Sequence, residues 1–149
     1  MNNFEKTYTS SLDTARDIAA DLTDYWSQCD VVSSDIEDLK LCVVELANNV
    51  FEHAYQEQEG KAIDVQCRFS DQDLVVTVAH FGLPLDEHSL ETMLSSDLPS
   101  LDPNDPFSWA TSGRGFYIMN ALLDDVNVQE SEGMTTFTLS KFNVLKPCR

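Results

Sequence analysis

The sequence predicts one α+β domain, a two-layer sandwich in which a mixed, mostly antiparallel sheet carries its helices on one face. Segments with hydrophobic residues at three- and four-residue intervals are followed by pairs of short, β-rich segments joined by short turns. Such adjacent pairs favour an antiparallel or mixed sheet over a doubly wound one. With 149 residues, 42% of them hydrophobic, the chain can bury one sizeable core but not two. Residues 1–149 are therefore expected to form a single domain.

The first third of the chain should form an edge strand and two helices. Residues 5–9 can form the strand, and Ser10 and Asp13 have the capping-box spacing that would begin the first helix. The buried face of this helix is expected to comprise Leu12, Ala15, Ile18, Ala19, Leu22, Tyr25 and Trp26. Ser34 and Glu37 repeat the capping-box spacing before the second helix. The expected core stripe of the second helix comprises Leu39, Val43, Leu46 and Val50.

Two hairpins, a long loop and a third helix should follow, after the second helix ends beyond Tyr55. The first hairpin is indicated by strict apolar and polar alternation, then a polar turn and a β-branched segment. Three prolines and a lack of periodicity indicate the loop, whose length is typical of lids and binding segments. In order, we expect a strand at 63–69, a turn at 70–73, a strand at 74–79, a lid-like loop at about 95–112, a helix at 116–123, and strands at 126–129 and 135–139 joined across 131–133.

Charge and composition argue against several classes of protein. With 26 acidic against 9 basic residues and a formal net charge of -17, the chain lacks the clustered Lys and Arg that direct nucleic-acid binding needs. No apolar run approaches the ~20 residues of a membrane helix, and the N-terminus lacks the pattern of a signal peptide. We therefore expect a cytoplasmic protein without a membrane partner. The four cysteines form no C-x-x-C pair, so neither a zinc site nor a disulfide framework is indicated.

Three polar side chains stand four residues apart on the second predicted helix. Glu45, Asn49 and His53 should therefore project from one face, away from the core stripe. A carboxylate followed one turn later by an amide suits a hydrated Mg²⁺ and the activation of a nucleophile, because Mg²⁺ takes few protein oxygens. An ordinary solvated helix face has the same spacing, and spacing alone favours that alternative.

Two glycine-containing segments follow the predicted strands and loops. Gly113, Arg114 and Gly115 lie between the long loop and an apolar helix, where glycine permits a tight turn and the first helical N–H groups can face an anion. Phosphate binding is the functional interpretation, and a plain loop-to-helix turn is the alternative. Gly82 follows the strand at 74–79, and by itself it indicates only the end of that strand.

In their order and spacing, these three segments together resemble a known family. The sequence ELANNVFEHAY at 45–55 is similar to the N-box of the GHKL (Bergerat-fold) ATPases, in the form found in anti-sigma factor serine/threonine kinases of the RsbW type. HFGLP at 80–84 takes the place of the G1 box, and GRGFYIMNALLDDV at 113–126 is similar to the G2 box and the helix and strand behind it. The resemblance runs from Thr9 to Lys141 and implies a Bergerat-type fold with ATP and Mg²⁺ as cofactors.

The resemblance implies a role for each matching residue. Glu45 would act as base toward a serine or threonine hydroxyl, Asn49 would hold the Mg²⁺ that bridges the phosphates, and His53 would lie near them. The backbone of Gly113 to Gly115 would wrap the triphosphate, with Arg114 adding charge neutralisation. The other nucleotide-binding residues that the resemblance implies are His80, Gly82 and Thr136.

The base end of this site departs from the family pattern. The G1 box of the family opens with an aspartate that accepts a hydrogen bond from the adenine amino group, whereas this chain has His80. A neutral histidine can offer one ring nitrogen as an acceptor, but without the charge that makes carboxylate hydrogen bonds about twice as strong. We therefore expect weaker or altered nucleotide binding. Gly82 is retained, which still lets the backbone approach the base.

Two functions from different classes follow. In the first, the chain is an ATP-dependent serine/threonine kinase that phosphorylates a STAS-domain antagonist, acts as a homodimer and has a sigma factor as its candidate second partner. In the second, the nucleotide pocket has decayed and the domain only sequesters a protein partner. Glu45 favours the first, because phosphoryl transfer needs it and docking does not. A two-component histidine kinase would need a dimerisation helix pair, and a metal hydrolase would need histidines at ligand spacing, so both are weaker alternatives.

Overall fold

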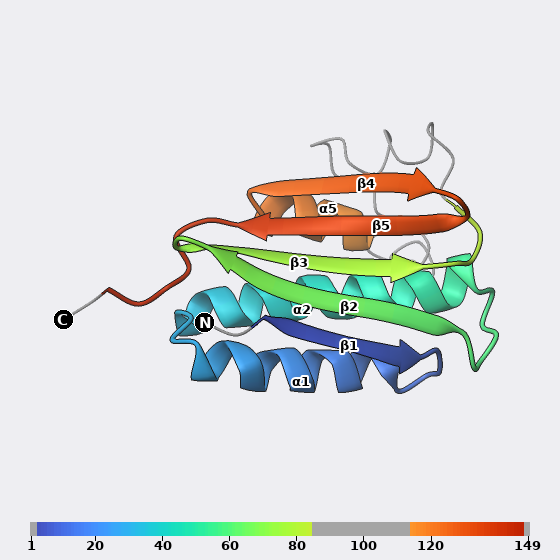
Figure 1. Ribbon diagram of the computed structural model, residues 1–149, viewed down its shortest axis with the longest axis horizontal. Helices are drawn as coiled ribbons and strands as arrows, with labels where there is room; N and C mark the ends of the chain where they lie inside the picture. Colours follow the sequence, from blue (N-terminus) through green and yellow to red (C-terminus); the bar gives the residue numbers. More distant parts are fainter. Residues whose placement is uncertain (1–2, 85–113, 148–149) are drawn as a thin grey trace, which may run out of the picture.

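The structure, a computed structural model, describes residues 3–84 and 114–147, with the backbone alone at 114–117. The elements in chain order are β1 (Phe4–Thr9), α1 (Thr14–Gln28), α2 (Ser33–Asn49), the π-helical turn η1 (Val50–Ala54), β2 (Ala62–Ser70), β3 (Asp73–His80), α5 (Arg114–Leu122), β4 (Asp125–Ser131) and β5 (Met134–Lys141). The strands form one antiparallel sheet in the order β1-β2-β3-β5-β4, and α1, α2 and α5 cover one face of it (Figure 1). The expected α+β sandwich is confirmed, while the loop expected at about 95–112 lies outside the described residues.

The hydrophobic core lies between this sheet and the helices. Its completely buried helix residues are Ile18, Leu22 and Trp26 of α1, Leu39, Cys42, Val43 and Leu46 of α2, and Met119 of α5. Its completely buried strand residues alternate along β2, β3 and β5, and they include Ile63, Val65, Leu74, Val76, Val78 and Leu139. The predicted helix stripes are confirmed except at Leu12, which is 77% exposed. Because α1 begins at Thr14, Leu12 precedes the helix and does not follow its period.

Neither predicted capping box forms. The Ser10 hydroxyl donates to the Gln58 carbonyl (2.7 Å) and accepts from the Lys61 N–H (2.9 Å), so it is bound to the segment before β2 and does not cap α1. The second helix begins at Ser33, after Val32, and no side chain caps its first N–H groups. Ser34 therefore lies inside the helix. Tertiary contacts thus explain the missing cap at Ser10, whereas α2 begins one residue before Ser34.

The hairpins form as expected and are longer than predicted. Ser70 pairs with Asp73 across a two-residue turn, and Ser131 pairs with Met134 across Glu132 and Gly133. Glu132 and Gly133 both have positive φ (52° and 81°), as a type I′ turn requires. The strands extend beyond the predicted limits because backbone pairing continues through polar residues that the hydrophobic pattern does not mark. Likewise α5 begins at Arg114, two residues before the predicted start.

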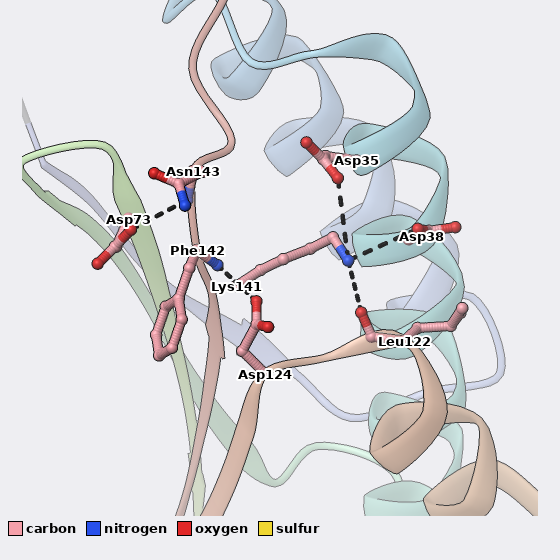
Figure 2. A network of polar contacts seen from close by, with 8 residues as sticks. All are labelled: Asp35, Asp38, Asp73, Leu122, Asp124, Lys141, Phe142 and Asn143. Atoms are coloured by element: carbon pink, nitrogen blue, oxygen red, sulfur yellow. Dashed lines mark hydrogen bonds and ion pairs between the residues drawn. The ribbon is translucent and has the colours of Figure 1, made fainter.

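Lys141, at the end of β5, joins three elements (Figure 2). Its ammonium group donates to the carbonyl of Leu122 at the end of α5 (2.5 Å) and lies 3.8 Å from Asp35 and 3.6 Å from Asp38, both near the start of α2. The ammonium group suits the dipole at the C-terminal end of α5, and the carboxylates suit the dipole at the start of α2. Only 13% of the Lys141 side chain is exposed, so this contact fixes α5 and α2 to the sheet.

The chain after β5 returns to the connection between α1 and α2. Val31 forms an isolated antiparallel bridge with Leu145, and the Val32 N–H donates to the Val144 carbonyl (2.8 Å). Val31 and Val144 are both buried. This C-terminal segment, 144–146, therefore closes one end of the core. Within the described ranges, the helices are too short or too polar to cross a bilayer.

Candidate functional site

A pocket opens where the end of α2 and η1 meet β3 and β5. Its lining comprises Asn49, Val50, His53, Ala54, His80, Leu83, Pro84 and Phe137, and its volume is about 170 Å³. The walls are apolar and a few polar groups converge on them, as is typical of sites for small molecules. The structure thus brings together three of the predicted site residues, Asn49, His53 and His80, which lie far apart in the sequence.

The end of the second helix widens at this pocket. The Tyr55 N–H donates to the Val50 carbonyl (2.9 Å), an i to i+5 bond that makes Val50–Ala54 a π-helical turn. Such turns are rare and are often found at functional sites. The last α-helical residue, Asn49, is half-buried, whereas His53 within the turn is exposed, and both border the pocket. A regular helix to Tyr55 was expected, so the π-turn is a correction to the sequence prediction.

Glu45 lies one α-helical turn before Asn49 and is half-buried. Residues four apart on an α-helix share a face, so its carboxylate lies on the side of α2 that leads to the pocket. It is not part of the pocket lining that the described residues form. Glu45 therefore lies one helical turn from Asn49, outside the pocket that Asn49, His53 and His80 border.

Gly82 lets the segment after β3 pack directly on η1. A Cβ at this position would lie 2.4 Å from the carbonyl oxygen of Ala54 and 2.8 Å from the Tyr55 ring, so no larger residue fits without a shift. The next residue, Leu83, donates its N–H to the same Ala54 carbonyl (2.8 Å). Gly82 therefore holds this segment against η1, and its neighbours Leu83 and Pro84 form part of the pocket lining.

His80, the last residue of β3, is 2% exposed. Its ring contacts those of Tyr55, edge to face, and Phe137, tilted, with centroid distances of 5.8 and 6.0 Å. Burial lowers the pKa of His80 from 6.5 to about 4, so the ring is neutral at pH 7. The Gly82 N–H donates to His80 Nδ1 (3.1 Å). A backbone N–H can only donate, so Nδ1 is the acceptor nitrogen and Nε2 carries the proton. The acceptor that we expected to face a base is already used by Gly82.

Tyr55 was part of the motif, but the sequence did not indicate its role. Its hydroxyl donates to the Ala62 carbonyl (2.5 Å) and accepts from the Phe81 N–H (2.8 Å). It thereby ties the end of η1 to the start of β2 and to the exit of β3. A tyrosine at the end of an amphipathic helix is the available signal, since a buried hydroxyl needs partners.

The second threonine of β5 does not face the pocket. Side chains alternate along a strand, and Phe137 points to the helix side and borders the pocket, so Thr136 points to the opposite face of the sheet. Thr135 lies on the pocket side, is 2% exposed and pairs with His80. The alternation therefore does not place Thr136 at the pocket, and its contact with a nucleotide stays a prediction.

The predicted glycine turn is described only in part. Gly113 lies outside the described residues, and Arg114 and Gly115 form the first two residues of α5. Gly115 is thus inside the helix and not in a turn before it. The start of α5 is described by its backbone alone, so its predicted role toward phosphates stays a prediction.

Comparison with known proteins identifies the family. The sequence matches the histidine kinase-like ATPase domain over residues 8–141. The chain belongs to this family. The matched range contains all nine of the predicted site residues, including the N-box helix and the G2-like segment.

Histidine kinase-like ATPase domains similar to this one include serine-protein kinases RsbW. The protein from Bacillus cereus strain B4264 is 34% identical over 102 residues, which cover 68% of this chain and 61% of that protein. The protein from Bacillus mycoides strain KBAB4 is 32% identical over 102 residues, with the same coverage. The chain thus spans less than two thirds of the length of these curated relatives.

Several solved structures share the fold of this chain. The RsbU and RsbW domains of a Mycobacterium tuberculosis protein match with a TM-score of 0.69 and 21% identity, over 100% of this chain and 34% of theirs. The SiaB-SiaC complex from Pseudomonas aeruginosa matches with a TM-score of 0.57 and 17% identity, over 91% of this chain and 88% of that chain. The catalytic domain of histidine kinase ThkA matches with a TM-score of 0.57 and 15% identity, over 93% and 96% of the two chains.

Proposed function

We propose that this domain is an ATP- and Mg²⁺-dependent protein serine/threonine kinase of a partner-switching system, which phosphorylates a STAS-domain antagonist. The main support is the pocket, where Asn49, His53 and His80 converge on apolar walls with the Glu45 carboxylate one helical turn away. The sequence relatives that are named serine-protein kinases add support for the same reaction.

The residues of the pocket fit a nucleotide and its metal ion. Val50, Leu83 and Phe137 provide apolar walls for a flat base, and Asn49 offers an amide oxygen at the polar end. Within the described ranges, no group of three or more His, Cys, Asp or Glu side chains could hold a metal ion. An ion held mainly by phosphate oxygens and water, with Asn49 as a protein ligand, suits Mg²⁺. Bound Mg²⁺-ATP would supply the phosphoryl group and neutralise its charge.

The remaining site residues orient the reactants and move a proton. We assign Glu45 as the base that takes the proton of the acceptor hydroxyl, and His53 as a group near the phosphates. Gly113 and Gly115 would offer backbone N–H groups to the phosphates, with Arg114 beside them. Phosphoryl transfer depends on positioning and electrostatics more than on covalent chemistry of the protein, so this small set of groups suffices.

The proposed partners are proteins. A STAS-domain antagonist is the substrate, a sigma factor is the second partner, and the domain itself forms a homodimer in the cytoplasm. The formal net charge of -17 would speed association with a basic partner surface. This long-range attraction should weaken as salt screens it.

The proposal is tested with the purified protein, Mg²⁺-ATP and a STAS-domain protein of the same organism. Phosphate should pass to a serine or threonine of that protein. Glu45→Gln should slow the transfer by roughly 100-fold or more, which is the range for loss of a general base. Binding of the STAS-domain protein by the variant should stay unchanged, because the carboxylate serves transfer and not docking.

Glu37→Gln is the matched control, because Glu37 is an exposed carboxylate on the same helix, two turns before Glu45. This variant should transfer phosphate at the same rate as the wild-type protein. Transfer by Glu45→Gln at that same rate would remove Glu45 from its role. A wild-type protein that binds the STAS-domain protein tightly but never phosphorylates it would instead support a sequestering module.

A further inference from the structure

His80 presents a fixed hydrogen-bond donor to the pocket, whereas the family pattern has an acceptor at this position. Nδ1 accepts the Gly82 N–H, so the proton of the neutral ring is on Nε2. Nε2 makes no hydrogen bond within residues 3–84 and 114–147, and it is not among the buried unpaired polar atoms there, where Thr23 Oγ1 stands alone. It therefore reaches accessible space. The space that His80 borders is the pocket.

The ring cannot easily reverse this polarity. The rings of Tyr55 and Phe137 lie against it, at 5.8 and 6.0 Å between centroids, and the residue is almost completely buried. A tautomer with the proton on Nδ1 would place two donors against each other, because the Gly82 N–H points at the same atom (3.1 Å). Gly82 is itself held by contact with Ala54 and by the adjacent bond from Leu83 to the Ala54 carbonyl (2.8 Å). The backbone therefore selects the tautomer.

A fixed donor discriminates between purines at position 6 of the ring. Adenine carries an amino group there, which is also a donor, whereas hypoxanthine and guanine carry a carbonyl oxygen, which is an acceptor. An amino group facing Nε2–H would leave two donors unpaired in an apolar pocket, and sites that leave polar groups unpaired reject the mismatched ligand strongly. A carboxylate at the same place has the opposite preference, since it only accepts.

We propose that His80 turns this pocket toward 6-oxopurine nucleotides, so that it binds inosine or guanosine nucleotides more tightly than adenosine nucleotides. The proposal rests on the proposed function, because it takes the purine base to lie beside His80. It gives the expectation of weaker or altered binding a defined chemistry, and it makes a 6-oxopurine triphosphate, in place of ATP, the preferred phosphoryl donor of the proposed kinase.

The test compares ADP with IDP, which differ at position 6 of the purine and in protonation at N1. Titration calorimetry in the presence of Mg²⁺ should give an IDP affinity about ten-fold higher than that of ADP for the wild-type protein. His80→Asp should reverse this order, because a carboxylate accepts from the amino group. His80→Asn should bring the two affinities within about two-fold, since an amide can rotate to donate or accept. Glu37→Gln should keep the wild-type ratio.

The outcomes distinguish the base preference from the nucleotide site itself. Equal or tighter ADP binding by the wild-type protein would overturn the base preference and leave the nucleotide site intact. Failure of both nucleotides to bind would overturn the proposed function and this inference with it. A ¹⁵N NMR spectrum of the free protein provides a test that needs no variant to fold. It should show the His80 proton on Nε2, and a proton on Nδ1 would contradict the proposal.

Discussion

The two ends of helix α2 are built in different ways. Near its start, Asp35 and Asp38 face Lys141, which also binds the end of α5, so charged contacts join three elements (Figure 2). At its end, the helix widens into η1, and Asn49 and His53 border a pocket with apolar walls. The first end fixes the helix to α5 and β5, and the second places polar groups at the pocket. We therefore expect substitutions at the first end to change stability without changing nucleotide affinity.

The largest expected effect comes from breaking the contact at the start of the helix. Lys141→Met keeps the length of the side chain but leaves two carboxylates and the Leu122 carbonyl without their cation. Burial raises the pKa of the Asp35 carboxyl even with Lys141 beside it, so the carboxylate is costly there. Unfolding in urea should show a loss of about 3 kcal/mol, the lower end for a broken buried pair because the carboxylates are partly exposed.

Lys6→Met is the control for this prediction. Lys6 forms an ion pair with Asp21 (2.9 Å), but its side chain is 53% exposed, so the change should cost less than about 1 kcal/mol. Nucleotide affinity should be the same in both lysine variants. A large fall in affinity for Lys141→Met would show that the two ends of α2 are coupled.

Acid should destabilise the pocket end through His80. The pKa of His80 is lowered from 6.5 to about 4 by burial, so the unfolded chain binds more protons than the folded protein between these pH values. Stability therefore rises with pH over this range and is lost as pH falls below about 6.5. Between pH 7 and pH 5 the loss from this group should be about 2 kcal/mol.

The measurement is urea unfolding at both pH values for the wild-type protein and for His80→Asn. The variant has no titrating group at position 80, so the difference between the two pH dependences isolates the histidine. Parallel curves for the two proteins would mean that His80 is not buried as a neutral ring.

Tyr55→Phe should have a smaller effect, because it removes one hydroxyl that serves two partners. The Ala62 carbonyl and the Phe81 N–H would each lose a hydrogen bond, for a total loss of about 1.5 kcal/mol. Amide hydrogen exchange should become faster at Phe81, next to the pocket, and stay unchanged at Leu139 in the core. Uniformly faster exchange would indicate global destabilisation instead of a local role.

The smallest effects distinguish the two threonines of β5. Thr136→Val should change nucleotide affinity by less than about 0.5 kcal/mol, as expected for a substitution away from the site. Thr135→Val should weaken binding more, because Thr135 is buried on the pocket side of the sheet beside His80. Calorimetry with IDP measures both, and a larger effect for Thr136→Val would reverse the assignment of faces.

The order of elements could be predicted from the sequence because it depends on local patterns. Helical spacing marked α1 and α2, and alternation with short turns marked the hairpins. The failures were tertiary: Ser10 had the spacing of a cap, but its hydroxyl is bound by Gln58 and Lys61, which lie far along the chain. The sequence did not predict the π-turn either, because the four-residue spacing of Asn49 and His53 is compatible with both an α-helix and a π-helical turn.

Within the candidate site, residue types were easier to predict than their states. The motif located Asn49, His53 and His80, and the structure places them on one pocket. The state of the His80 ring depends on the direction of one backbone N–H, which no sequence pattern records. The side of the sheet on which Thr136 lies could have been predicted, because side chains alternate along a strand and the apolar Phe137 is expected to face the core.

The bridge between Val31 and Leu145 has a consequence for synthesis on the ribosome. Val31 is synthesised early, whereas its bridge partner Leu145 follows the last strand of the sheet. Lys146, whose N–H donates to the Asp30 carbonyl (2.9 Å), comes one residue later. Domains tend to fold as units. The growing chain therefore holds all five strands of the sheet before residues 144–146 can cover the α1–α2 corner, and that corner stays exposed until these residues have emerged.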